Sequence, residues 1–314
     1  MLSRRDLLVG AGAASVAIVA GGKQRLLAKA SQPSTPVAFA VPAGSCDCHT
    51  HVFGDPSRFA FAASRTYTPE PASTDEMSAL HRALHLDRVV IVQPSVYGTD
   101  NACTLDGIRQ LGARARGVAV IDERTPRAAL QDMHRQGIRG IRLNLATAGQ
   151  TDPGIARQRF DAAVAQIEPL NWHVQIYTQL SIVTAMKDRI LASPVPVVFD
   201  HFGGAQAAPG VGQPGFDDLV ELVRSGRAYV KISAPYRSSS RRPDYADVTP
   251  LARALIGANV QRILWGSDWP HVSFRGTMPN PGDLLDLLAA SVPDLQALEA
   301  VLVHNPHRLY GFGS

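Results

Sequence analysis

Two short stretches near opposite ends of this 314-residue chain carry the same kind of chemistry. Residues 46–51 are Cys-Asp-Cys-His-Thr-His, and residues 265–271 are Trp-Gly-Ser-Asp-Trp-Pro-His. Successive side chains of a strand point to opposite faces, so strict alternation places Asp47, His49 and His51 together on one face. Two imidazoles at the end of an early strand, together with a carboxylate at the end of a late strand, are typical of an active site at one end of a barrel.

Between these stretches, short apolar runs alternate with segments of helical periodicity. We expect strands at 44–49, 88–93, 116–121, 138–143, 172–177, 195–201, 228–233 and 261–267. We expect helices within 76–86, 104–114, 126–136, 155–169, 179–192, 215–226 and 247–258. The alternation favours βα units with a parallel sheet, and eight units in this length match an α/β fold of the (β/α)₈ TIM-barrel type. A doubly wound open sheet is the alternative, but no glycine-rich phosphate-binding sequence follows an early strand.

Polar residues stand at or just beyond the C-terminal ends of these expected strands, where active sites of such barrels lie. They include His49, His51, Ser95, Arg142, Tyr177, His201, Ser233 and Asp268. The longest irregular stretches, 52–75, 234–246 and 270–284, also follow strand ends. We expect these loops to build a substrate pocket or a lid.

The first 30 residues are typical of a signal for export by the twin-arginine (Tat) machinery. Arg4-Arg5 precede an apolar run over 9–22, and Ala28-Lys29-Ala30 offers a cleavage site. A membrane anchor is the alternative, but the run is short for a bilayer span. We therefore expect a periplasmic protein without stable membrane association after signal cleavage. A flexible lead-in over 31–43 and a single catalytic domain over 44–314 would follow.

Charge and cysteine content narrow the class of protein further. Residues 1–30 hold five Lys/Arg and one acid, so the remaining chain has 26 residues of each sign. A neutral domain gives no support for nucleic acid as a partner. The three cysteines, Cys46, Cys48 and Cys103, are expected to be small buried residues without disulfides.

Seven segments together resemble the amidohydrolase superfamily, and within it the lactonase branch that includes the 2-pyrone-4,6-dicarboxylate lactonases. These segments are 47–54, 65–72, 92–101, 137–144, 197–204, 230–237 and 265–271. The resemblance implies that Asp268 activates the hydrolytic water and that His49, His51 and His201 polarise the lactone carbonyl. It also implies that Arg142 and Arg237 hold a substrate carboxylate, while Tyr67, Ser95 and Tyr177 complete the pocket.

These implied roles agree with elementary chemistry. A lactone carbonyl develops negative charge when water attacks it, and imidazole donors aimed at that oxygen stabilise the charge. A carboxylate can take the proton from water and deliver one to the leaving alkoxide. A guanidinium can bind a planar carboxylate through two hydrogen bonds.

Many members of the superfamily bind zinc through a first-strand histidine pair, a fifth-strand histidine and the eighth-strand aspartate. Here Tyr177 stands where the fifth-strand histidine would be, and the nearby Arg142 disfavours a cation. We therefore expect no cofactor. The alternative is one divalent metal, zinc, on His49, His51 and Asp268.

The substrate is less well indicated than the family. The dicarboxylate-pyrone lactonases carry a second basic residue where this chain has Ala148. We expect a small, carboxylated lactone of pyrone, muconolactone or sugar type, with one carboxylate clamp missing. A zinc-dependent hydrolase or decarboxylase is one alternative. A non-catalytic periplasmic binding protein is another, although such a protein has no need of a general base.

Overall fold

The computed structural model describes residues 30–274 and 276–313, and the predicted export signal therefore lies almost wholly outside the described residues. Eight parallel strands pair in the order of the sequence. They are β1 (Cys46–Thr50), β2 (Arg88–Val92), β3 (Ala115–Ala119), β4 (Ile138–Asn144), β5 (His173–Tyr177), β6 (Val197–Phe199), β7 (Ala228–Ser233) and β8 (Ile263–Gly266). The predicted TIM barrel is confirmed.

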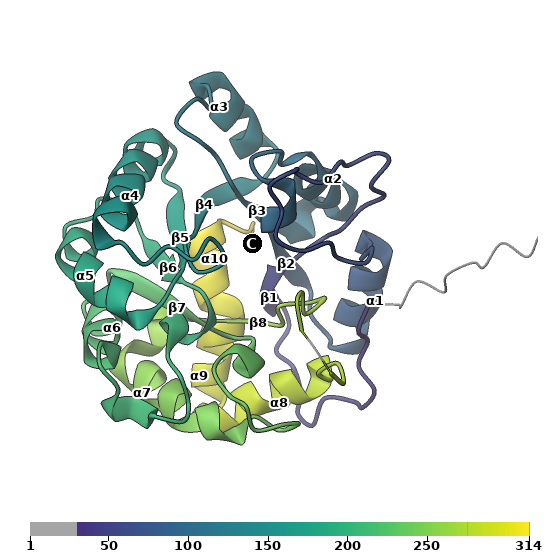
Figure 1. Ribbon diagram of the computed structural model, residues 1–314. Coiled ribbons are helices and arrows are strands. Elements are labelled where there is room, and N and C mark those ends of the chain that lie inside the picture. Colours follow the sequence, from purple (N-terminus) through teal and green to yellow (C-terminus); the bar gives the residue numbers. More distant parts are fainter. Residues whose placement is uncertain (1–29, 275, 314) are drawn as a thin grey trace, which may run out of the picture.

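Helices surround the strands as a ring (Figure 1). They are α1 (Thr74–Ala83), α2 (Ala102–Leu111), α3 (Arg127–Arg135), α4 (Pro153–Ile167), α5 (Leu180–Leu191), α6 (Phe216–Arg224), α7 (Thr249–Asn259), α8 (Pro281–Ser291), α9 (Leu295–Glu299) and α10 (Asn305–Tyr310). Helix starts carry capping residues: Ser73 and Glu76 form a reciprocal capping box at α1, and the Asn280 side chain accepts from Gly282 N at α8. Among the described residues, no helix is both long and apolar enough to cross a bilayer.

The barrel is nearly closed where its first and last strands meet. His51 N donates to Trp269 O and Asp268 N donates to His49 O, both at 2.9 Å. Gly266 permits this approach, because a Cβ there would lie 2.6 Å from the Cβ of His49. The seam therefore brings the two stretches that define the fold into direct contact.

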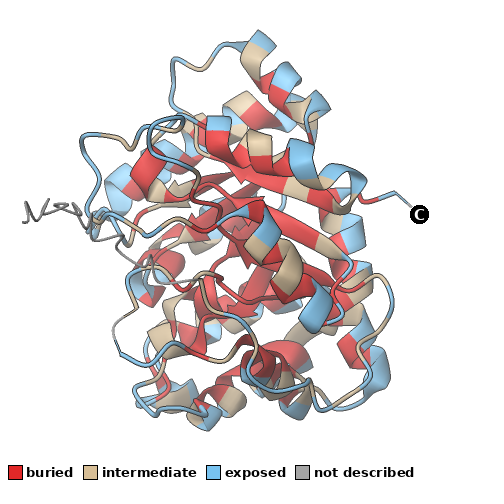
Figure 2. Cartoon of the chain, turned by 90° about the vertical axis from the view of Figure 1, so that its right-hand side faces the viewer, coloured by how far each residue is buried: buried red, intermediate tan, exposed pale blue. Residues whose placement is uncertain are grey.

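Two apolar layers hold the barrel together, and the strands between them are almost entirely buried (Figure 2). The larger layer lies between strands and helices. The smaller one contains Cys46, Cys48, Val90, Val198 and other strand residues, closed by Tyr310 and Phe312 at the end of the chain. Phe312 packs beneath the guanidiniums at the starts of β2 and β3, so the chain end covers the N-terminal mouth. All three cysteines are free and buried, as predicted.

The predicted alternation along β1 is wrong. Asp47 turns toward the helices, where its Oδ2 lies 3.4 Å from His81 Nε2 of α1. Cys46 and Cys48 belong to the inner layer, and the pairing register shifts between Asp47 and Thr50. A bulge of this kind changes which face the following residues occupy. His49 and His51 therefore point into the barrel although Asp47 does not.

The segment predicted as a lead-in, 31–43, is irregular and attached to the barrel. Trp269 Nε1 donates to Ser31 O at 2.7 Å, and Ala38 N donates to an Asp286 carboxylate oxygen of α8 at 2.8 Å. These bonds bring this part of the chain to the loop that follows β8.

Candidate active site

A cavity of about 220 Å³ opens at the C-terminal end of the barrel. Eight residues singled out from the sequence line it: His51, Tyr67, Ser95, Arg142, Tyr177, His201, Arg237 and Asp268. The ninth, His49, lies directly beneath, with its Nε2 3.4 Å from Asp268 Oδ1. A cavity of this volume suits a small molecule.

Asp268 is the residue on which the site converges. It follows β8 in a left-handed conformation, with φ 59°, which a non-glycine residue adopts at a cost in energy. Its Oδ2 accepts from Tyr236 OH at 2.7 Å and from Arg237 Nε and Nη2 at 3.1 and 2.9 Å. Burial alone would raise the pKa of this carboxyl, but Arg237 and the histidines hold it well below its usual range. Asp268 is therefore ionised.

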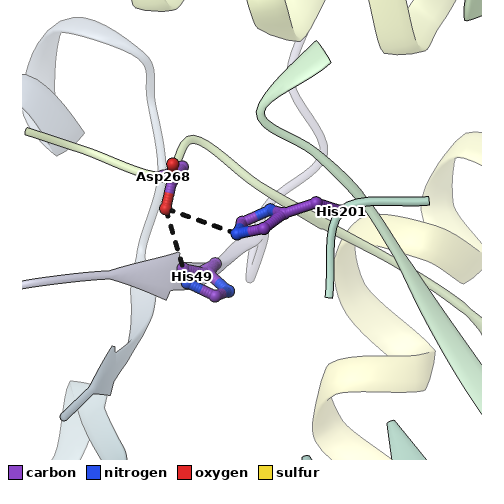
Figure 3. A group of neighbouring side chains, drawn as sticks. All are labelled: His49, His201 and Asp268. Atoms are coloured by element: carbon purple, nitrogen blue, oxygen red, sulfur yellow. Dashed lines mark ion pairs between the residues drawn. The ribbon is translucent and has the colours of Figure 1, made fainter. Parts of the chain in front are cut away.

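The other oxygen, Oδ1, faces three imidazoles and has no hydrogen-bond partner among the described residues. It lies 3.4 Å from His49 Nε2, 3.5 Å from His51 Nε2 and 3.8 Å from His201 Nε2. Figure 3 shows the arrangement for His49, His201 and Asp268. Burial lowers the pKa of His49 well below its usual range and that of His201 to about 3, so both rings are neutral.

The far side of each ring decides which nitrogen carries its proton. His51 Nδ1 lies 2.7 Å from Val92 O, an acceptor, so this nitrogen carries the proton and Nε2 carries a lone pair. His49 Nδ1 lies 3.2 Å from Asp200 Oδ1, which can only accept, and 3.3 Å from Lys231 Nζ, which can only donate, so the two contacts favour opposite tautomers. His201 differs, because its Nδ1 meets the Ser233 hydroxyl at 2.8 Å, and a hydroxyl can donate or accept.

The Asp268 carboxylate oxygen and the Nε2 atoms of His49, His51 and His201 thus face one another at the end of the barrel. Neither Asp268 Oδ1 nor His49 Nε2 has a hydrogen-bond partner among the described residues. Donor atoms of His49, His201 and Asp268 lie within 4.8 Å of one another, and the residues fit a divalent metal. The prediction that no cofactor binds is not supported by this geometry. The metal alternative also changes, because the grouped histidines are His49 and His201 rather than His49 and His51.

A second charged cluster lies below the cavity inside the barrel. Arg142 donates to Asp200 Oδ2 from Nε at 3.1 Å, and Lys231 Nζ lies 3.6 Å from Asp200 Oδ1. Burial would raise the pKa of Asp200, but His49, Arg142 and Lys231 lower it, while burial lowers the pKa of Lys231. Lys231 also donates to Gln175 Oε1 at 2.7 Å. The cluster holds the far side of His49 in place.

The residues predicted to bind substrate meet across the cavity. The guanidiniums of Arg142 and Arg237 lie 5.6 and 5.9 Å from the ring centre of Tyr177. Each is paired with a protein carboxylate, Asp200 or Asp268. Burial raises the pKa of Tyr67, so its hydroxyl stays a donor.

Lys231, Tyr236 and His271 also belong to the site, although the sequence does not predict a site role for any of them. A signal for Lys231 was present, because it is the only charged residue of the strand Ala228–Ser233. Tyr236 offers a weaker signal, since it directly precedes Arg237 in a loop. His271 is fully buried, with Nδ1 3.1 Å from Tyr236 OH.

A buried carboxylate surrounded by histidines at the C-terminal mouth of a (β/α)₈ barrel defines a hydrolase-type site in this fold. The chain belongs to the amidohydrolase family, whose model matches residues 46–312. The resemblance found from the sequence is therefore confirmed.

Three similar proteins refine this placement. The chain is 35% identical to a protein of Comamonas testosteroni named 2-pyrone-4,6-dicarboxylate hydrolase, over 89% of this chain and 94% of the relative. It is 34% identical to 4-sulfomuconolactone hydrolase of Hydrogenophaga intermedia, over 88% and 91%. A crystal structure from Pseudomonas putida, provisionally described as a 2-pyrone-4,6-dicarboxylic acid hydrolase, superposes with a TM-score of 0.78 at 30% identity, covering 87% of this chain and 100% of that one.

Proposed function

We propose that this enzyme hydrolyses a small lactone that carries a single carboxylate. The observation that carries the proposal is the position of Asp268, an ionised carboxylate at the floor of a small cavity. Its Oδ1 faces three histidines and has no hydrogen-bond partner in the described part of the chain. The names of the relatives support the same reaction class, since they are called hydrolases of a pyrone and of a muconolactone.

The residues divide the reaction between them. Asp268 Oδ1 takes a proton from the attacking water and later returns one to the leaving alkoxide. His201 is the histidine free to donate, because the Ser233 hydroxyl can donate to its Nδ1 and leave the proton on Nε2, which faces the cavity. That N–H would stabilise the charge developing on the carbonyl oxygen. His51, whose Nε2 carries a lone pair, can then accept a hydrogen bond from the water, and His49 Nε2 lies beside the same carboxylate oxygen.

The charges of the site favour a substrate with one negative charge. Arg142, Arg237 and Lys231 supply three positive charges against the carboxylates of Asp200 and Asp268. The net charge of these five groups is therefore +1, which one carboxylate neutralises. Ala148 supplies no further charge beside Thr147, which lines the cavity. Both arginines line the cavity, and Arg237 is the clamp that substrate reaches first because its side chain is less buried than that of Arg142.

A metal-dependent form of the same enzyme is a second candidate, favoured by the acceptor atoms that converge near Asp268. His49, His201 and Asp268 would hold the ion. When bound, it would supply Lewis-acid polarisation of the carbonyl or of water.

The test is a hydrolysis screen over pyrone, muconolactone and sugar lactones, each in mono- and dicarboxylated form, with and without chelator. We expect the highest kcat/KM for a monocarboxylated lactone. Elemental analysis of the same preparation separates the two candidates: stoichiometric zinc, with activity lost to chelator and restored by zinc, establishes the metal form. A binding protein without turnover would be revived if no lactone were hydrolysed under either condition.

A further inference from the structure

The Tyr236 hydroxyl bridges Asp268 and His271, two residues of the loop that follows β8. Tyr236 lies in the 3₁₀ turn Pro235–Arg237 after β7 and is not among the cavity-lining residues. Its hydroxyl meets Asp268 Oδ2 at 2.7 Å on one side and His271 Nδ1 at 3.1 Å on the other. The bridge therefore links the proposed general base to a buried histidine three residues further along the chain.

The protons of this bridge can be assigned by counting donors. A carboxylate can only accept, so the single Tyr236 proton goes to Asp268 Oδ2, 2.7 Å away. His271 must then donate from Nδ1 to the phenol oxygen. Its buried Nε2 has no hydrogen-bond partner among the described residues.

The bridge fixes which carboxylate oxygen faces the histidines. Tyr236 and Arg237 both bind Oδ2, and Oδ1 is left for His49, His51 and His201. Arg237 lines the cavity and is the proposed clamp for the substrate carboxylate, so substrate competes with Asp268 for it. Tyr236 is not exposed to that competition. Its ring is packed against His271, Tyr245 and Phe274, with ring centres 5.6, 6.2 and 5.0 Å away.

The backbone around Asp268 explains why an additional anchor is needed. Asp268, His271 and Ser273 all adopt left-handed φ values, 59°, 62° and 61°. Each such residue costs energy and persists only where its surroundings hold it. His271 N closes the turn on Asp268 O at 2.7 Å, and the Tyr236 bridge joins the two side chains of the same turn.

We propose that Tyr236 and His271 are positioning residues that keep Asp268 Oδ1 aimed into the cavity while Arg237 engages the substrate carboxylate. This inference rests on the proposed lactone hydrolysis. His271 acts only through Tyr236, and Tyr236 acts only through Asp268. The two residues should therefore affect kcat as one unit rather than as two independent contributions.

The first test is Tyr236→Phe, which keeps the ring and removes the hydroxyl. We expect kcat to fall about 10- to 100-fold with KM changed less than about threefold, because a hydrogen bond to a charged group is lost away from the substrate. Arg237→Met should instead raise KM strongly. The matched control is Tyr245→Phe. The Tyr245 hydroxyl forms no hydrogen bond with a site residue among the residues that the structure describes, so kcat should stay at the parent value.

The second test is a double-mutant cycle with His271. His271→Ala should lower kcat, and His271→Asn should restore most of it, because its amide nitrogen can replace Nδ1 as donor and Asn tolerates a positive φ. In the Tyr236→Phe background, His271→Ala should lower kcat no further. Thermal unfolding of each variant excludes loss of fold as the cause.

The outcomes separate this inference from the proposed function. If the parent enzyme hydrolyses lactones and Tyr236→Phe has parental kcat, the positioning role is wrong while the function stands. Additive losses in the cycle would also overturn it, since they would mean that His271 acts independently of Tyr236. If the parent hydrolyses no lactone, the proposed function fails before the variants are compared.

Discussion

At the scale of single residues, the site depends on a carboxylate held by two different kinds of partner. Asp268 Oδ2 is bound by Arg237 and Tyr236, and Oδ1 is left for chemistry. A low pKa makes a carboxylate a weak base, so the pairing with Arg237 works against proton transfer. A substrate carboxylate that binds Arg237 would weaken the pairing of Arg237 with Asp268. The pKa of Asp268 would then rise, and Asp268 would become a stronger base.

Asp268→Asn tests this role directly. We expect kcat to fall by about 10²- to 10⁴-fold, because the amide cannot take the proton from water. KM should stay equal or fall, since Arg237 is released from its partner and becomes free to bind a substrate carboxylate. Steady-state kinetics with a circular dichroism spectrum of the variant provide the check. Parental turnover in a folded variant would remove Asp268 from the mechanism.

The sequence predicted that the candidate site residues meet at the C-terminal end of the barrel, but it could not assign their partners. Eight of the nine predicted residues line one cavity, because strand ends in a βα barrel meet at one face. The pairings of Arg142 with Asp200 and of Arg237 with Asp268 depend on side-chain reach across the barrel. The role of Tyr236 likewise depends on its contact with Asp268, and its place directly before Arg237 is only a weak local signal.

At the scale of elements, the bulge in β1 is what turns His49 and His51 into the barrel. Period-two alternation cannot reveal it, because the extra residue changes the phase without changing the composition of the strand. The predicted strand positions were otherwise close to those observed. Helices α8 to α10 were not predicted, although Asn280-Pro281 is a recognisable helix start.

The seam between β1 and β8 gives the second prediction. Gly266→Ala would place a Cβ 2.6 Å from His49 Cβ and 2.7 Å from His49 N. We expect a loss of about 1–3 kcal/mol in the free energy of unfolding, together with reduced kcat as His49 is displaced. Urea unfolding and kinetics on the same preparation measure both effects.

Gly257→Ala in α7 is the matched control, because a Cβ there meets nothing within 4 Å. It should stabilise the protein by about 0.5–1 kcal/mol, the usual gain for alanine over glycine within a helix, and leave kcat unchanged. Equal effects of the two substitutions would mean that the seam is not tightly packed.

At the scale of the whole molecule, the interior of the barrel should make the protein sensitive to acid. His173 is buried beside Tyr310, and neither ring nitrogen has a hydrogen-bond partner among the described residues. Burial lowers its pKa to about 3, so the folded state holds the neutral ring. The unfolded chain, with an ordinary histidine pKa near 6.5, binds the proton first as pH falls.

The stabilising effect of the neutral ring is thus fully present above about pH 6.5 and decreases as pH falls toward 3. His173→Leu should remove this proton linkage. The slope of the free energy of unfolding against pH should then decrease by about 1.4 kcal/mol per pH unit between pH 6 and 4. Unfolding free energies of parent and variant at several pH values provide the measurement. A difference between the two that stays constant from pH 8 to 4 would contradict the prediction.

The junction of the first strand with the last has a consequence for the order in which the molecule becomes active. The bonds between Asp47 and Ser267 join positions 220 residues apart, and His49 meets Asp268 across the same junction. His49 and His51 therefore lie on the first strand, whereas their partner carboxylate follows the last strand of the barrel. The candidate site is complete only when β1 and β8 have met, so a fragment that ends before Asp268 should lack the proposed lactone hydrolysis.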